Sequence, residues 1–307
     1  MTKFIAPFFF LILFACTPNE EESSSLNSFQ GVFSSEPPLE ADVVFYKDIP
    51  YGSGDREKMD LLLPNNKALE GLVVFFHGGS FQFGSKEDLY REELQPILKA
   101  TLENNIAFAS VGYTFITDAQ SEGVFTALEN GSDAIDFLRK NSAALNIPSN
   151  KIILAGVSAG AGIALWNGFS EQTNAEVEGI LALYAQSSYD LYQWNSLFED
   201  FDLDSIRNQN SDIETLFTQF YGGEYTSEKG LRLDFSNQMD GDDPPLYLYN
   251  PTYEEDVFSG ETLNLDVLFH SYKHADFLRA KAIEVGLPIS GAYVNFPQDF
   301  IRNTLLD

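Results

Sequence analysis

One serine in this chain stands in a setting that favours nucleophilic chemistry. An apolar run over residues 151–157 leads directly into the sequence Gly-Val-Ser-Ala-Gly at residues 156–160, with Ser158 at its centre. Small residues on both sides of a serine let a strand and a helix approach each other closely. The serine backbone can then be held in a strained turn that exposes its hydroxyl. The pattern therefore predicts a nucleophile at Ser158.

A second motif upstream could stabilise the negative charge that such a nucleophile creates. Residues 71–76 are apolar, rich in β-branched and aromatic side chains, and are followed by His77, Gly78 and Gly79. Such a run is typical of a parallel strand that is covered on both faces. Glycines after it leave backbone N–H groups free to point at a developing oxyanion. Each motif alone is compatible with a simple glycine turn, but the two together, in this order, predict an oxyanion hole beside Ser158.

Strands and helices that alternate along the chain must position these two loops. The apolar patterns predict strands at residues 43–46, 59–63, 72–76, 106–115, 151–157, 177–185, 246–249 and 289–294. Helical spacing predicts helices at residues 87–103, 124–145 and 272–285, with Pro96 kinking or ending the first of them. The strands at 43–46 and 59–63 are expected at the edge of the sheet. This alternation implies right-handed crossovers and a mostly parallel, doubly wound α/β sheet.

Residues 188–243 interrupt the alternation with an acidic segment that is rich in aromatic side chains. We expect a mostly helical, cap-like insertion above the carboxyl ends of the strands, where open α/β sheets bind ligands. The alternative is a structural excursion whose aromatic rings pack on one another.

The net charge of the chain limits the classes of molecule that it is expected to bind. The 307 residues include 18 Lys and Arg against 46 Asp and Glu, which gives a net charge of -28. Long-range repulsion of this size argues against a nucleic-acid partner. Solubility, or life in a salty medium, is a sufficient explanation of the charge. No part of the sequence calls for a cofactor.

The amino terminus resembles an export signal. Residues 1–15 carry one lysine followed by an apolar run too short to span a bilayer, and Cys16 comes next. Residues 13–16 resemble the lipobox of bacterial lipoproteins, which implies cleavage before Cys16 and its lipidation; the alternative is an ordinary signal peptide with an incidental cysteine. We expect a flexible tether over residues 16–41 and a catalytic domain over residues 42–307. The acidic tract at residues 20–22 resembles tracts that direct lipoproteins to the cell surface. An exported bacterial lipoprotein of the outer membrane or cell surface follows.

Residues 77–86, 110–113 and 156–160 together resemble the α/β-hydrolase superfamily, in its carboxylesterase and feruloyl-esterase-like branch. The resemblance extends over about residues 42–296. It implies acyl transfer through Ser158, with an oxyanion hole formed by the N–H of Ala159 and that of Gly78 or Gly79. It also implies an ester substrate, either a small molecule or an acylated or feruloylated saccharide.

The same resemblance orders the catalytic residues as serine, acid and histidine. The acid should follow the strand at residues 246–249, where Glu254 is nearest the usual position, ahead of Glu255 and Asp256. The histidine should follow residue 294, but the chain contains three histidines and none lies there. His77 belongs to the oxyanion loop, which leaves two histidines that could act as the base.

These two, His270 and His274, are four residues apart and would share one face if both were helical. We expect His274 to be the base. Alternatively, the pair lines the pocket without catalysing, or both are ordinary helix histidines. A shared metal is a weaker alternative, because the pair lacks the glutamate spacing of zincins. Two hypotheses remain: an exported, lipid-anchored serine esterase, and a catalytically silent relative that binds a ligand or partner at the cell surface.

Overall fold

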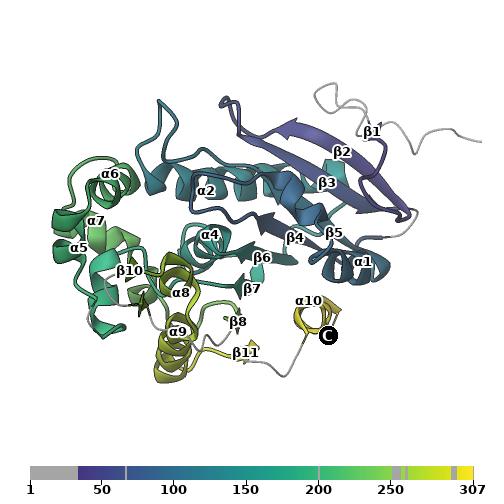
Figure 1. Ribbon diagram of the computed structural model, residues 1–307. Coiled ribbons are helices and arrows are strands. Elements are labelled where there is room, and N and C mark those ends of the chain that lie inside the picture. Colours follow the sequence, from purple (N-terminus) through teal and green to yellow (C-terminus); the bar gives the residue numbers. More distant parts are fainter. Residues whose placement is uncertain are drawn as a thin grey trace, which may run out of the picture.

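A mixed β-sheet organises the part of the chain that the computed structural model describes, residues 34–65, 68–199, 201–250, 257–259, 262–291 and 296–306 (Figure 1). Across the sheet the described strands follow the order β1 (Ser34–Ser35), β2 (Val43–Pro50), β3 (Lys58–Pro64), β5 (Ile106–Val111), β4 (Gly71–Phe76), β6 (Ile152–Val157), β7 (Val177–Leu183), β8 (Leu246–Tyr249) and β11 (Ile289–Gly291). The pairs from β1 to β5 are antiparallel, and those from β5 to β11 are parallel. The predicted α/β class with a mostly parallel, doubly wound sheet is confirmed.

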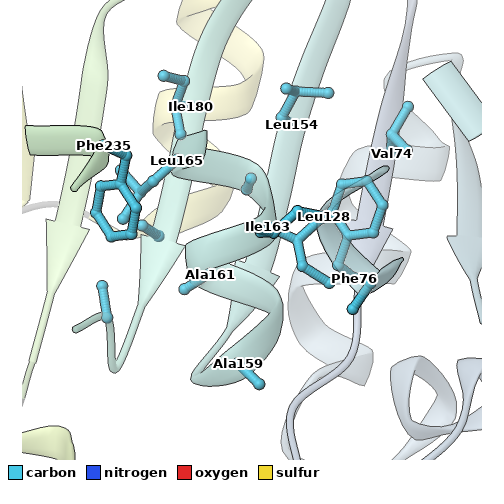
Figure 2. Packing of buried hydrophobic residues seen from close by; sticks show 14 of the residues in the cluster. Val74, Phe76, Leu128, Leu154, Ala159, Ala161, Ile163, Leu165, Ile180 and Phe235 are labelled. Atoms are coloured by element: carbon cyan, nitrogen blue, oxygen red, sulfur yellow. The ribbon is translucent and has the colours of Figure 1, made fainter. Parts of the chain in front are cut away.

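Helices cover both faces of this sheet because its central strands are apolar on both faces. In β4, Leu72, Val74 and Phe76 point into one core cluster, whereas Val73 and Phe75 point into the other. The first cluster is covered by α2 (Val124–Lys140), α4 (Ala159–Gly168) and α9 (Tyr272–Val285). Figure 2 shows residues of this cluster, with Leu128 and Ile163 beside Phe76. The second cluster is covered by α1 (Gln95–Glu103) and α10 (Pro297–Leu306).

Two further groups of elements lie beyond the central strands in sequence. Between β7 and β8 the chain forms η2 (Leu191–Ser196), α5 (Leu203–Gln209), α6 (Ser211–Phe220), α7 (Ser227–Leu233) and η3 (Phe235–Asn237). Between β8 and α9 it forms a small hairpin of β9 (Phe258–Ser259) and β10 (Thr262–Leu263), and then α8 (Leu265–His270). These elements gather near one end of the sheet, beside α4 (Figure 1).

Several expected elements differ in their bounds. The strands predicted at residues 43–46 and 59–63 are not the outermost strands, because β2 lies between β1 and β3, and β3 lies between β2 and β5. The helix predicted at 87–103 divides into η1 (Lys86–Tyr90) and α1, and Pro96 lies in the first turn of α1, where its missing N–H costs nothing. The helix predicted at 124–145 divides into α2 and α3 (Ser142–Leu145).

The strand predicted at 106–115 ends at Val111, and the final strand ends at Gly291, before residues 292–295, which lie outside the described residues. Within the described ranges, no helix is both long and apolar enough to span a membrane.

Candidate active site

Ser158 occupies a sharp turn between β6 and α4. Its backbone has φ 54° and ψ −119°, a strained conformation for a residue with a side chain. The turn also needs glycine nearby, because a Cβ at Gly160 would collide with the carbonyl of Phe76 in the adjacent strand. The sequence pattern around Ser158 thus folds as expected, and the turn raises the serine hydroxyl above the end of the sheet.

The loop after β4 lies beside Ser158 because β4 and β6 are parallel neighbours. A Cβ at Gly78 would lie 3.0 Å from the carbonyl of Val157 and 3.4 Å from the Ser158 Cβ. Gly79 has φ 116°, a region that favours glycine. In the described part of the chain, the backbone N–H groups of Gly78, Gly79 and Ala159 have no protein acceptor. Donors from these residues are therefore close to Ser158 and available to an oxyanion.

The buried side chain of His77 supports this loop. Its ring is fully buried and stacks on Tyr113 with 4.3 Å between ring centroids. Nδ1 donates to the Gly78 carbonyl over 2.7 Å, and the Tyr113 hydroxyl donates to the His77 carbonyl over 2.8 Å. Burial lowers the pKa of His77 to about 4, so the ring is neutral at physiological pH. His77 is therefore a neutral, buried residue that supports the loop after β4.

A buried ion pair holds the far end of the same loop. Lys86 Nζ lies 3.0 Å from Asp60 and 2.9 Å from Asp48, and the Asp60 side chain is fully buried. The Ser110 hydroxyl donates to the Lys86 carbonyl over 2.6 Å. Because a buried carboxylate left without its cation costs about 3–5 kcal/mol, Lys86 is firmly held.

The histidine within reach of the serine is His270. Its Nε2 lies 2.9 Å from Ser158 Oγ, and its Nδ1 lies 2.8 Å from the Asp266 carboxylate. A carboxylate can only accept, so Nδ1 carries the proton and Nε2 is left as an acceptor for the serine hydroxyl. Ser158, His270 and Asp266 thus form a connected set in which a base faces the serine and an acid orients the base.

The expectation that His274 faces Ser158 is corrected by this geometry. Ser271 separates α8 from α9, so His270 and His274 lie on different helices and do not share a face. His274 is fully buried between the rings of Trp194 and Phe198.

Both ring nitrogens of His274 are already engaged. The Ser187 N–H and hydroxyl donate to Nδ1 over 3.2 and 3.0 Å, and Nε2 donates to the Leu268 carbonyl over 2.8 Å. Burial lowers the pKa of His274 to about 4, so the ring stays neutral. His274 therefore supports α8 instead of contacting the serine.

The expected acid, Glu254, lies outside the described residues, as do Glu255 and Asp256. The carboxylate that contacts His270 comes from Asp266, in the first turn of α8, which the sequence analysis did not select. A usable signal was present: an aspartate and a histidine four residues apart meet on one helical face. Asn264 before them is a good N-cap, and its side chain accepts from the Val267 N–H.

Helix α8, which carries both residues, is held at its carboxyl end by buried side chains. A helix leaves its last carbonyls without partners inside the helix. Here His274 donates to the Leu268 carbonyl, Gln186 Nε2 donates to that of Phe269 over 2.7 Å, and Asn250 Nδ2 donates to that of His270 over 3.2 Å. We call these three side chains the α8 cradle. The cradle fixes a helix of six residues against the end of the sheet and thereby places His270.

Within the described ranges, no group of three or more His, Cys, Asp or Glu side chains is placed to hold a metal ion.

Comparison with known proteins finds one family model and several relatives that match this chain. The model of the BD-FAE family matches residues 59–262, which include Ser158, Gly78 and Gly79. The chain is 31% identical to an isoprenylcysteine alpha-carbonyl methylesterase from Arabidopsis thaliana over 134 residues, 43% of this chain and 29% of that protein. It is 45% identical to a kynurenine formamidase from Danio rerio over 42 residues, 13% of this chain and 14% of that protein. The chain thus matches less than a third of the length of these relatives.

Solved structures resemble the whole fold. A truncated carbohydrate esterase from gut microbiota superposes with a TM-score of 0.67 at 13% identity, covering 89% of this chain and 100% of that one. Esterase B from Lactobacillus rhamnosis superposes with a TM-score of 0.60 at 15% identity, covering 84% and 76%. At these identities the likeness concerns the fold.

Proposed function

The chain belongs to the BD-FAE family of feruloyl-esterase-like α/β-hydrolases, and on that premise we propose that it hydrolyses carboxylic esters through an acyl-enzyme on Ser158. The observation that carries the proposal is the 2.9 Å contact between Ser158 Oγ and His270 Nε2. A serine hydroxyl is a poor nucleophile until a base takes its proton, and this contact provides the base.

In the proposed reaction, Ser158 Oγ attacks the ester carbonyl carbon as its proton passes to His270 Nε2. The N–H groups of Ala159 and of Gly78 or Gly79 hold the resulting oxyanion. His270 then gives the proton to the alcohol oxygen as that bond breaks, which leaves the acyl group on Ser158. Water, deprotonated by the same nitrogen, releases the carboxylate and restores the serine.

Asp266 assists by orienting the imidazole and by stabilising its positive charge. The Asp266 side chain is 68% exposed, so water screens part of this effect.

A catalytically silent relative that binds a partner was favoured by the lack of a histidine after residue 294. With His270 within hydrogen-bonding distance of Ser158, that reason no longer holds. The esterase is therefore the better supported of the two hypotheses.

The direct test is hydrolysis of short p-nitrophenyl esters by the wild type and by Ser158→Ala. We expect kcat to fall by at least about 10³-fold in the variant, because the nucleophile is lost. Equal kcat values for the wild type and Ser158→Ala would contradict the proposal.

We also propose that the protein is exported and anchored to a membrane by a lipid. The lipobox-like sequence ending at Cys16 supports export and a lipid anchor at the bacterial outer membrane or cell surface; these residues lie outside the described ranges. Acylated saccharides are the substrates we expect in that setting. Metabolic labelling with a fatty-acid analogue should mark the wild type and not Cys16→Ser, and labelling of both would refute the anchor.

A further inference from the structure

Two hollows meet at Ser158. The first, the cap cavity, is lined mainly by aliphatic and aromatic side chains of α5, α6 and α8, among them Leu203, Ile206, Ile213, Leu216, Phe217 and Leu268. The second, the outer groove, is lined by residues that include Phe83, Asp88, Arg91, Glu93, Tyr184 and His270. Ser158 lines both, so an ester bound at the serine can extend one half into each.

The cap cavity suits an aliphatic chain. Three polar groups on its wall already donate to backbone carbonyls: the Tyr189 hydroxyl to Ala159, the Gln186 amide to Phe269 and the Trp194 N–H to Ser188. A polar substituent in the cavity would lose hydration without gaining these donors. The cavity measures about 110 Å³. An apolar cavity of about 150 Å³ in another protein binds benzene, so a chain of about four to six carbon atoms fits here.

The outer groove suits a polar ring. It is wider, at about 570 Å³, and its edge carries Phe83, whose side chain is 68% exposed. Asp88, Arg91 and Glu93 add charged groups to the wall. A sugar ring has apolar C–H faces and hydroxyls at its rim. An exposed aromatic ring next to charged hydrogen-bonding groups matches both features.

His270 decides which half of the ester enters which hollow. The base must return its proton to the alcohol oxygen as the alcohol leaves, so the alcohol must lie on the His270 side of the serine. His270 lines the outer groove and is not one of the described residues that line the cap cavity.

Resting on the proposed esterase function, we propose that the cap cavity is an acyl subsite for aliphatic chains of about four to six carbons and that the outer groove holds a sugar-like alcohol. The protein is then selective for medium-chain aliphatic esters of saccharides. Aromatic hydroxycinnamoyl esters fit the cavity poorly, because a hydroxyphenyl ring on a propenoyl arm is bulkier than benzene, which occupies a cavity of about 150 Å³ in another protein.

The acyl half is tested with p-nitrophenyl acetate, butyrate, hexanoate, decanoate and ferulate. We expect kcat/KM of the wild type to peak at butyrate or hexanoate. Ile206→Trp fills the cavity and should lower the hexanoate-to-acetate ratio of kcat/KM by about tenfold or more. Ile283→Trp is the matched control, because Ile283 is 67% exposed on α9, and it should keep the wild-type ratio.

Because Ile206→Trp could fail to fold, a second variant changes the cavity volume in the opposite sense. Leu216→Ala enlarges the cavity and should raise the decanoate-to-hexanoate ratio. A flat acyl profile in the wild type, or ratios unchanged in both cavity variants, would overturn the acyl subsite.

The alcohol half is tested with two butyrate esters, methyl butyrate and a butyrylated methyl xyloside. Phe83→Ala removes the exposed ring and should lower the xyloside-to-methyl ratio of kcat/KM about fivefold or more, the size of a lost stacking contact at an exposed site. Phe296→Ala removes an equally exposed ring, at 67%, from the segment before α10 and should not change the ratio. An unchanged ratio in Phe83→Ala, or a change caused by Ile206→Trp instead, would contradict the assignment of the groove.

The experiments distinguish an error in the proposed subsites from an error in the proposed esterase function. An active enzyme with a flat acyl profile contradicts the subsites alone. No hydrolysis of any ester, together with no labelling of Ser158 by a fluorophosphonate, contradicts both.

Discussion

The chemistry at the residue scale depends on how the two ring nitrogens of His270 are used. Nε2 faces the Ser158 hydroxyl at 2.9 Å and Nδ1 faces Asp266 at 2.8 Å. His274 provides the contrast, because its nitrogens hold together Ser187 and the Leu268 carbonyl. Two histidines four residues apart thus have different tasks, and what separates the tasks is the solvent access and partners of each ring.

Asp266→Asn tests the acid at this scale. The amide keeps the size of the side chain and can still accept from Nδ1, but it no longer stabilises the imidazolium ion. Because Asp266 is largely exposed, we expect kcat to fall by about 10- to 100-fold, less than for a buried acid. Initial-rate kinetics check this, with Asp276→Asn on α9 as a control of similar exposure, at 61%. An unchanged kcat in Asp266→Asn would remove Asp266 from the reaction.

The sequence identified Ser158 and the glycine loop because both depend on local backbone geometry that small residues reveal. It named His270 and His274 as the two possible bases, and the preference for His274 was wrong for a physical reason. Two histidines four residues apart share a face only when both lie in one helix. Here α8 ends at His270 and α9 begins after Ser271, so the two histidines lie in different helices. Asp266 was missed because the acid was sought after β8, as in the family pattern.

At the scale of the elements, helix α8 carries both His270 and Asp266. It has six residues, too few to be stable by itself, so tertiary contacts must hold it. The α8 cradle does so through buried donors from three segments: the loop after β7, the residue after β8, and α9. No local pattern reveals such an arrangement, whereas the sheet and its large helices follow from periodicity.

Gln186→Met tests the cradle. The substitution keeps the volume but removes the donor to the Phe269 carbonyl, so α8 should be less well placed. We expect kcat to fall about tenfold, KM to change little, and the free energy of unfolding to fall by about 1–3 kcal/mol. Steady-state kinetics and urea unfolding measure both. Gln238→Met, at an exposed position, is the control. A loss of stability with kcat unchanged would limit Gln186 to a structural role.

At the scale of the whole molecule, charge and buried histidines govern the response to solvent. The net charge of -28 disfavours anionic ligands and helps to expel the carboxylate product. His77 and His274 are both buried and neutral, with pKa values near 4 against 6.5 for a free histidine. The folded state therefore excludes two protons that the unfolded chain takes up.

Stability should consequently fall as the pH decreases from about 6.5 toward 4, and it should be complete above that window. At pH 5 each of the two histidines should cost about 2 kcal/mol of the free energy of unfolding. Urea unfolding at pH 7 and pH 5 checks this against His274→Gln, whose amide can make similar hydrogen bonds without titrating. The variant should lose about 2 kcal/mol less than the wild type, because all carboxylates are common to both. Equal losses would contradict the buried neutral state of His274.

The proposed activation of Ser158 by His270 can be measured directly. The rate at which a fluorophosphonate labels Ser158 reports that activation without depending on the choice of ester. We expect His270→Ala to lower the second-order labelling rate by at least about 100-fold while its circular dichroism spectrum stays that of the wild type. Labelling of His270→Ala at the wild-type rate would contradict the claim.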